Sequence, residues 1–173
     1  MIFTGIKRKS NQIFFNKKIK EFVDNSNKST SEKVKNILVL LDNISDKEII
    51  LENLKNNFGN TLHNIELVVF QSKVKKETID KNIFTPKDFG WFGKIKSQAL
   101  KSILTKKYDL LINYSKIDNL YNNLLILHCK EAFRVGFAIF DNRLYDLIID
   151  CESENISLFN IELKKYLVIL NKI

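Results

Sequence analysis

The pattern of apolar and polar positions divides the 173-residue chain near residue 36. Before that point apolar residues recur at helical spacing over 5–24, where Phe15, Ile19 and Phe22 stand at i, i+4 and i+7. The polar stretch DNSNKSTSEK (24–33) follows, rich in the turn-forming residues of a linker. The pattern therefore predicts a basic helical arm with its linker over 1–35 and a separate domain over 36–173.

From residue 36 onward, continuous apolar runs alternate with segments of helical spacing. Such runs are typical of strands that are buried on both faces of a sheet. The runs predict strands at 36–42, 65–70, 108–114, 134–140 and 145–150. The helical segments are 46–58, 97–105, 118–129 and 157–170. This alternation predicts a three-layer α/β domain with a mainly parallel five-stranded sheet of Rossmann-like or flavodoxin-like type.

The net charge of +8 matters mainly through its distribution along the chain. Lys, Asn and Ile number 25, 20 and 23, a bias that the codon usage of an AT-rich genome produces without any ligand. The excess positive charge lies in two segments. Residues 1–36 contain nine Lys and Arg against three Asp and Glu, and residues 71–107 contain ten against three. Two such segments favour contact with an anionic partner.

The segment FTPKDFGWFGK (84–94), called the aromatic loop below, is the least ordinary part of the sequence. It holds the only Pro and the only Trp of the chain, together with two Gly and three Phe. Such a loop either packs over the carboxyl edge of the sheet or presents aromatic side chains to a partner. In the second interpretation Phe89, Trp91 and Phe92 make the aromatic contacts.

The leading prediction is a non-enzymatic binding module for an anionic partner, with RNA or a ribonucleoprotein such as the ribosome as first candidate. The basic arm also suits a solvated helix docked on its own domain, or a helix that binds an acidic membrane or protein surface. The residues expected to contact nucleic acid are Lys7, Arg8, Lys9, Lys17, Lys18, Lys87, Lys94 and Lys96.

Two alternatives stay open beside this prediction. The first is an enzyme or small-molecule binder with a pocket at the carboxyl ends of the strands, lined by Asp42, Asn113, Ser115 and Asp150. Residues of these types also serve as turn formers and helix caps at strand ends. The second is a protein-interaction scaffold that is anchored by the aromatic loop. No catalytic residue is predicted, because no nucleophile motif, G-x-G-x-x-G turn or Walker pattern is found.

The cysteine and histidine residues are expected to pack in the protein rather than to carry out chemistry. Cys129 and Cys151 lie in or beside apolar stretches without C-x-x-C spacing, so we expect buried, reduced thiols. His63 and His128 are expected to be packed core residues rather than ligands, and neither a metal nor a cofactor is predicted. No apolar run approaches ~20 residues and no signal peptide is recognised, so the expected location is the cytoplasm.

Several segments together resemble a known family. They are KRKSNQIFFNK (7–17), PKDFGWFGK (86–94), YDLLINY (108–114), FRVGF (133–137), RLYDLIID (143–150) and YLVILNKI (166–173). The family consists of proteins from Bacteroidetes-type bacteria and is described only as a domain of unknown function, so the resemblance implies no chemistry. DLLINY, a helix and then FRVGF are also similar to the N-terminal half-domain of heptosyltransferase-like glycosyltransferases. That likeness implies an α/β fold, although the chain is too short for the sugar-nucleotide-binding half.

Overall fold

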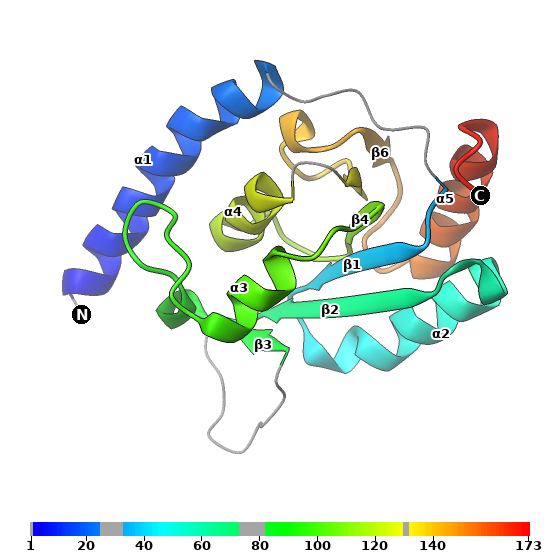
Figure 1. The fold of residues 1–173 in the computed structure, drawn as a ribbon, viewed down its shortest axis with the longest axis horizontal. Coiled ribbons are helices and arrows are strands. Elements are labelled where there is room, and N and C mark those ends of the chain that lie inside the picture. Colours follow the sequence, from blue (N-terminus) through cyan, green and yellow to red (C-terminus); the bar gives the residue numbers. More distant parts are fainter. Residues whose placement is uncertain (1, 25–32, 73–81, 130–131) are drawn as a thin grey trace.

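The computed structural model describes residues 2–24, 33–72, 82–129 and 132–173. At its centre lies a six-stranded sheet in the order β3-β2-β1-β4-β5-β6, with every pair of neighbours parallel (Figure 1). The strands are β1 (Asn36–Leu41), β2 (Asn64–Phe70), β3 (Ile83–Phe84), β4 (Leu110–Asn113), β5 (Phe133–Phe137) and β6 (Leu147–Ile149). The α/β prediction is confirmed, while the predicted number of strands is one too low.

The strand that the sequence does not predict is β3, which consists of two residues beside the end of β2. Ile83 pairs with Val69 and Phe84 with Phe70. Two apolar residues are too few to show any periodicity, so this strand exists because the edge of β2 offers hydrogen-bonding groups. By contrast, β1 lies between β2 and β4, and its residues 37–41 are almost completely buried. Burial on both faces explains its continuous apolar run.

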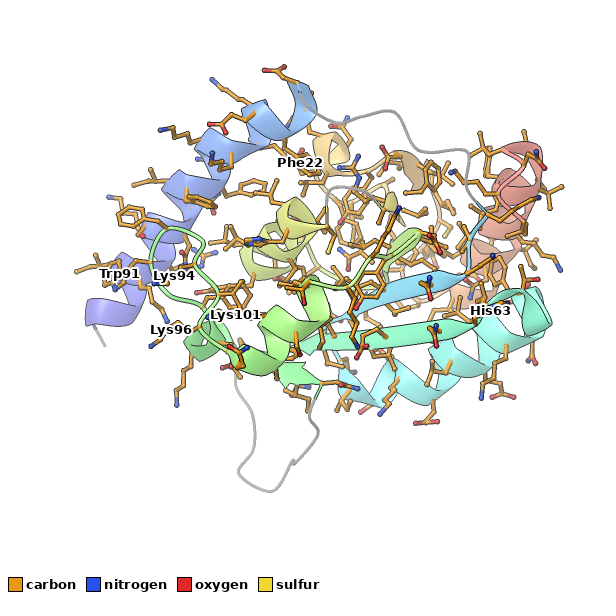
Figure 2. All side chains as sticks on the ribbon, in the orientation of Figure 1. Phe22, His63, Trp91, Lys94, Lys96 and Lys101 are labelled. Atoms are coloured by element: carbon orange, nitrogen blue, oxygen red, sulfur yellow. The ribbon has the colours of Figure 1, made fainter. Side chains whose placement is uncertain are left out.

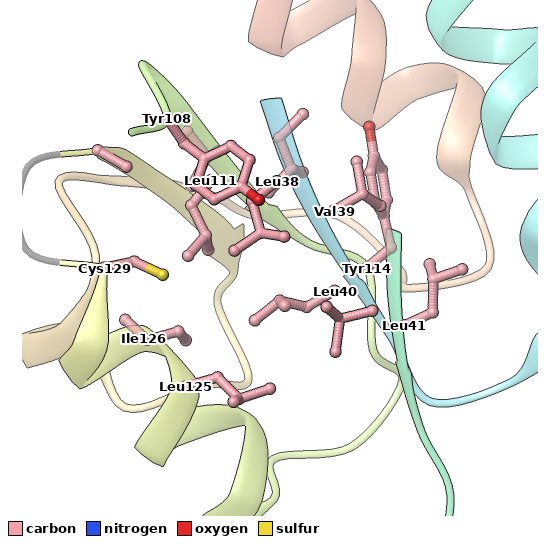
Figure 3. Close-up of a cluster of buried hydrophobic side chains, with 14 of the residues drawn as sticks. Leu38, Val39, Leu40, Leu41, Tyr108, Leu111, Tyr114, Leu125, Ile126 and Cys129 are labelled. Carbon is pink, nitrogen blue, oxygen red and sulfur yellow. The ribbon is translucent and has the colours of Figure 1, made fainter. Parts of the chain in front are cut away.

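Five α-helices surround the sheet in the part of the chain that the structure describes. They are α1 (Ile2–Asp24), α2 (Lys47–Phe58), α3 (Gln98–Leu104), α4 (Leu120–His128) and α5 (Ile156–Ile169). Helix α1 packs on α4, and α2 packs on α5. Figure 3 shows α4 and α5 on opposite sides of the strands, with Leu40 and Leu111 facing α4 while Val39 and Tyr114 face α5. Because side chains alternate along each strand, the sheet contributes apolar side chains to a layer on each of its two faces.

Helix α1 shares the core of the rest of the chain. Phe15, Ile19 and Phe22 are buried in the same cluster as the strands, as their helical spacing predicts. The guanidinium of Arg134, on β5, lies 4.5 Å from the centre of the Phe22 ring. The chain between α1 and β1, which the sequence predicts as a linker, falls mostly in residues 25–32, outside the described part of the structure.

The two cysteines and the two histidines differ in their exposure to solvent. Cys129 is buried and Cys151 is half-buried, and both are free thiols. His63 and His128 are exposed, so the prediction of two packed core histidines is wrong. His63 stands just before β2, and His128 is the last residue of α4. Both therefore lie at the end of an element, beyond its buried apolar residues. Across the described residues, no helix is long and apolar enough to cross a membrane.

Candidate functional site

The aromatic loop folds back on itself after β3. Thr85 begins a short 3-10 turn, and the Asp88 carboxylate accepts hydrogen bonds from the Thr85 backbone N–H (2.8 Å) and hydroxyl (3.0 Å). Pro86 supplies the fixed φ that suits the first position of such a turn. Phe89 and Ile95 then form an antiparallel bridge, which brings the two arms of the loop together. The loop is therefore a compact, ordered unit.

Phe89 holds this unit to the carboxyl end of β2. Its side chain is fully buried and lies against two rings, with centroid distances of 6.3 Å to Phe70 and 4.9 Å to Tyr121. Phe70 and Tyr121 also stack on each other at 4.8 Å. The expectation that Phe89 contacts a partner needs correction, because its ring fills the core between β2 and α4.

Two polar residues of α1 bind the backbone of the aromatic loop. The buried Asn11 side chain donates through Nδ2 to the Gly90 carbonyl (3.1 Å) and accepts through Oδ1 from the Gly93 N–H (2.8 Å). The Ser10 hydroxyl accepts from the Phe92 N–H (3.0 Å). Loop backbone groups that would otherwise be buried without partners are thus satisfied by one turn of a distant helix.

Lys7 adds a charged contact one turn earlier. Its ammonium donates to the carbonyls of Pro86 (2.7 Å) and Phe89 (3.0 Å). Burial lowers the pKa of Lys7, and the charge of Lys96 acts in the same direction, while Asp88 opposes both. The basic segments predict Lys7 as a nucleic-acid contact. The structure instead directs its ammonium inward, to loop carbonyls.

Gly93 fits this contact for a steric reason. Its φ is +72°, in the region that favours glycine, and a Cβ at this position would lie 2.3 Å from Cε1 of Phe14. The ring of Phe14, on α1, therefore packs directly on the loop backbone. Helix and loop approach so closely that only a residue without a side chain fits between them.

The contact between α1 and the aromatic loop places basic residues of both segments at the same end of the molecule. Figure 2 shows Trp91, Lys94 and Lys96 beside the N-terminal part of α1, at the end of the molecule opposite His63. The side chains of Trp91 and Phe92 are 44% and 63% exposed. Within residues 8–17 and 87–96, the exposed basic residues are Arg8, Lys9, Lys17, Lys87, Lys94 and Lys96. We call these eight residues the basic–aromatic face.

Besides Lys7, the predicted contact Lys18 is not counted in this face. Its side chain is partly buried and forms an ion pair with Glu21, one turn further along α1. Residues 73–81, which carry part of the second basic segment, fall outside the described residues. The basic–aromatic face is therefore defined by residues 8–17 of α1 and by residues 87–96.

The strand-end carboxylates predicted for a pocket lie on separate strands. Asp42 follows β1, and its Oδ2 accepts from the backbone N–H groups of Lys116 (2.7 Å) and Ile117 (3.3 Å). Asp150 follows β6 and is exposed. Two strands, β4 and β5, separate β1 from β6, which corresponds to about 14 Å at normal strand spacing. The two carboxylates therefore do not form an acid–base pair.

The other two predicted pocket residues bind neighbouring protein groups. The buried Asn113 side chain donates to the Tyr145 hydroxyl (2.8 Å) and accepts from the Ser115 N–H (3.1 Å). The Ser115 hydroxyl accepts from the side-chain amide of Asn122 (2.6 Å). Burial raises the pKa of Tyr145, which keeps its hydroxyl neutral and able to donate or accept. Asn113 and Ser115 thus bind groups of the protein itself, and the hydrogen bond from the Ser115 N–H to Asn113 is that of a turn-forming residue.

A cavity of about 310 Å³ lies elsewhere, where β4 and β5 begin. It is lined by Leu104, Thr105, Lys106, Lys107, Tyr108, His128, Cys129 and Ala132, and so by none of the predicted pocket residues. Burial raises the pKa of the Cys129 thiol to about 12, which disfavours a nucleophilic thiolate at neutral pH. Within the described ranges, no three His, Cys, Asp or Glu side chains gather to hold a metal ion.

Sequence reasoning missed Ser10, Asn11 and Phe14, although a weak signal exists. Asn11, Phe15 and Phe22 occupy one side of α1 at spacings of four and seven residues, so a polar residue stands within an otherwise apolar face. A buried amide in such a position needs hydrogen-bond partners. Its partners are 79 and 82 residues away, and no local pattern identifies them.

The fold and this contact together define a class: a parallel α/β protein whose helix α1 is hydrogen-bonded to an aromatic loop that follows β3. A family model, described as a family of unknown function (DUF6913), matches residues 7–170. The chain belongs to this family, which confirms the resemblance to a domain of unknown function. Neither the curated proteins nor the solved structures include a match to this chain.

Proposed function

We propose that the protein is a non-enzymatic module that binds single-stranded RNA, free or exposed on a ribonucleoprotein, through the basic–aromatic face. The observation that carries the proposal is the set of hydrogen bonds that join Ser10 and Asn11 with the backbone of the aromatic loop. They unite two basic segments that lie about 80 residues apart in the sequence. The union supplies a positive surface with two exposed aromatic rings.

The chemistry of this face suits unpaired nucleotides. Lysine ammonium groups attract phosphates, and each neutralised phosphate releases counterions. Trp91 and Phe92 expose ring faces on which bases can stack, an interaction that tolerates any base sequence. Unstacked bases occur in single-stranded RNA and in loops, whereas a duplex hides them. We therefore expect a preference for single strands, little sequence preference and a strong dependence on salt.

The strand-end pocket is the weaker candidate. We take the fold to be Rossmann-like, because the order β3-β2-β1-β4-β5-β6 is that of dinucleotide-binding sheets, with the change of direction between β1 and β4. Ligands of such sheets bind in the crevice at that point. Here the Asp42 carboxylate bridges it, since it follows β1 and accepts from backbone groups just after β4. Contacts between Asp42 and the protein's own loop after β4 therefore occupy the crevice.

The test is titration of the protein into a labelled single-stranded RNA of about 12 nucleotides, followed by fluorescence anisotropy. With about four phosphate contacts, we expect affinity to fall about fifty-fold between 50 and 200 mM salt. The double variant Lys9→Glu, Lys94→Glu should weaken binding at least about tenfold, because it reverses two charges on the face. Trp91→Ala should weaken it by about 1–3 kcal/mol if the ring stacks on a base.

The matched control is the double variant Lys55→Glu, Lys164→Glu, which makes the same charge change at exposed positions of α2 and α5. If both double variants lose affinity equally, or if the RNA does not bind, the proposal is wrong. Vesicles that contain anionic lipid provide a second comparison. Binding to vesicles but not to RNA would assign the face to a membrane surface instead.

A further inference from the structure

Helix α5 has apolar residues on both its inner and its outer side. Its inner side buries Phe159, Leu163 and Leu167 completely against the sheet. Its outer side exposes between 41% and 69% of four aliphatic side chains: Leu158, Ile161, Val168 and Ile169. A helix on the surface of a globular protein normally presents a polar outer face. A cluster of exposed aliphatic residues on one helix marks an interaction surface.

The spacing of the outer residues is that of a helix–helix contact. Leu158, Ile161, Lys165 and Val168 follow one another at intervals of three, four and three residues. This is the spacing of the two core positions in a heptad, which form a narrow seam along one side of a helix. The 14 residues of α5 give that seam a length of about 21 Å.

The charges on this seam are arranged symmetrically about the middle of the helix. Glu162 and Lys165 lie at equal distances on either side of the point between Leu163 and Lys164, and they form an ion pair at 2.7 Å. Leu158 and Ile169 lie at equal distances further out. If a second α5 runs antiparallel across the first about that point, Glu162 stands level with the partner's Lys165. Leu158 then stands level with the partner's Ile169.

We infer that α5 is the interface of a homodimer, in which two copies of the chain pack their α5 helices antiparallel about a two-fold axis. A two-fold interface uses the same patch on both subunits and must be self-complementary, and this seam meets both conditions in charge and in apolar character. One seam is smaller than the ~800 Å² per partner of a standard stable interface. We therefore expect a dissociation constant on the order of ten micromolar.

The first experiment is sedimentation velocity of the full chain over a range of concentrations, without RNA. We expect a monomer at low and a dimer at high concentration. Ile161→Asp should raise the dissociation constant at least about tenfold, because it places a carboxylate in the seam. Ile139→Asp is the control, since Ile139 is similarly exposed but lies outside α5. A chain that stays monomeric above about 200 µM, well beyond the expected constant, would overturn the inference.

The second experiment tests the antiparallel register. Glu162→Lys alone sets like charges opposite each other in its homodimer, as does Lys165→Glu alone, so each variant should dimerise at least about tenfold more weakly. When the two variants are mixed, every cross-helix pair is again of opposite sign. The mixture should therefore form a heterodimer at near wild-type strength. If mixing restores nothing, the register is wrong, and loss of the ion pair within each helix cannot mimic a rescue that needs both variants.

Discussion

Helices α1 and α5 are the two longest helices, and they are attached to the protein in different ways. The inner side of α5 is fixed by rings and aliphatic groups, among them Phe159, whose centroid lies 4.4 Å from that of Phe137. Helix α1 buries fewer apolar residues for its length and depends on polar contacts from Lys7, Ser10 and Asn11 to loop backbone. Their exposed residues differ as well. Helix α1 exposes several basic residues together with Ile6 and Ile13, whereas α5 exposes the aliphatic row described above.

The way in which a helix is attached affects what it can present to solvent. Apolar contacts are non-directional, so they hold α5 by the area they bury. Hydrogen bonds are directional, so they fix α1 at one position relative to the aromatic loop. A surface that depends on the alignment of two distant segments, such as the basic–aromatic face, needs the second kind of attachment.

The largest effect is expected for Phe159→Ala. The ring of Phe159 is fully buried between Tyr114 and Phe137, so its removal leaves a cavity under α5. We expect the free energy of unfolding to fall by about 3–5 kcal/mol, measured by urea denaturation. A loss below about 1 kcal/mol, the scale of an ordinary surface substitution, would mean that apolar packing does not dominate the attachment of α5.

A smaller effect is expected for Asn11→Ala. This change leaves the Gly90 carbonyl and the Gly93 N–H without their partner in a buried site, at a cost of about 1–3 kcal/mol. Hydrogen exchange should show faster exchange in α1 and residues 89–96, with the strands unchanged. The exposed Asn16 of the same helix supplies the control, Asn16→Ala. Equal stability of the two variants would argue that the polar contacts do not hold α1.

The smallest effect concerns the two thiols and leaves stability unchanged. Burial raises the pKa of Cys129 to about 12, and it also raises the pKa of Cys151, with help from the charges of Asp150 and Glu152. Only the thiolate reacts with iodoacetamide, and Cys151 is the more accessible thiol. We expect Cys151 to be labelled at least about tenfold faster at pH 8, with both rates rising as pH increases. Mass spectrometry of the digested protein measures both rates. Faster labelling of Cys129 would show that the end of α4 opens readily.

Local patterns predict the parts of this fold that depend on local physics. The run NILVLL gives β1, and the spacing of Phe15, Ile19 and Phe22 gives the buried side of α1. The two-residue strand β3 has no pattern of its own. The contact between α1 and the aromatic loop also depends on partners that no local sequence reveals.

The candidate site shows the same limit. Phe89 and Phe92 are three residues apart in one loop, yet the first is fully buried and the second is 63% exposed. Their neighbours in the sequence do not distinguish them. The difference arises because Phe89 faces the rings of Phe70 and Tyr121, which β2 and α4 bring together. Residue types and charge could therefore locate the basic–aromatic face, but only the tertiary fold decides which members are accessible.

The separation between α1 and its loop has a consequence for protein synthesis. Asn11 and Gly93 are 82 positions apart, so at 5–20 residues per second the ribosome needs about 4–16 s to make the second after the first. Throughout that time α1 exists without the backbone groups that fix it. Phe14 and Phe15 have no completed surface to cover them in the same interval. Helix α1 is thus made well before the loop that fixes it, and its final position must wait until Gly93 has been translated.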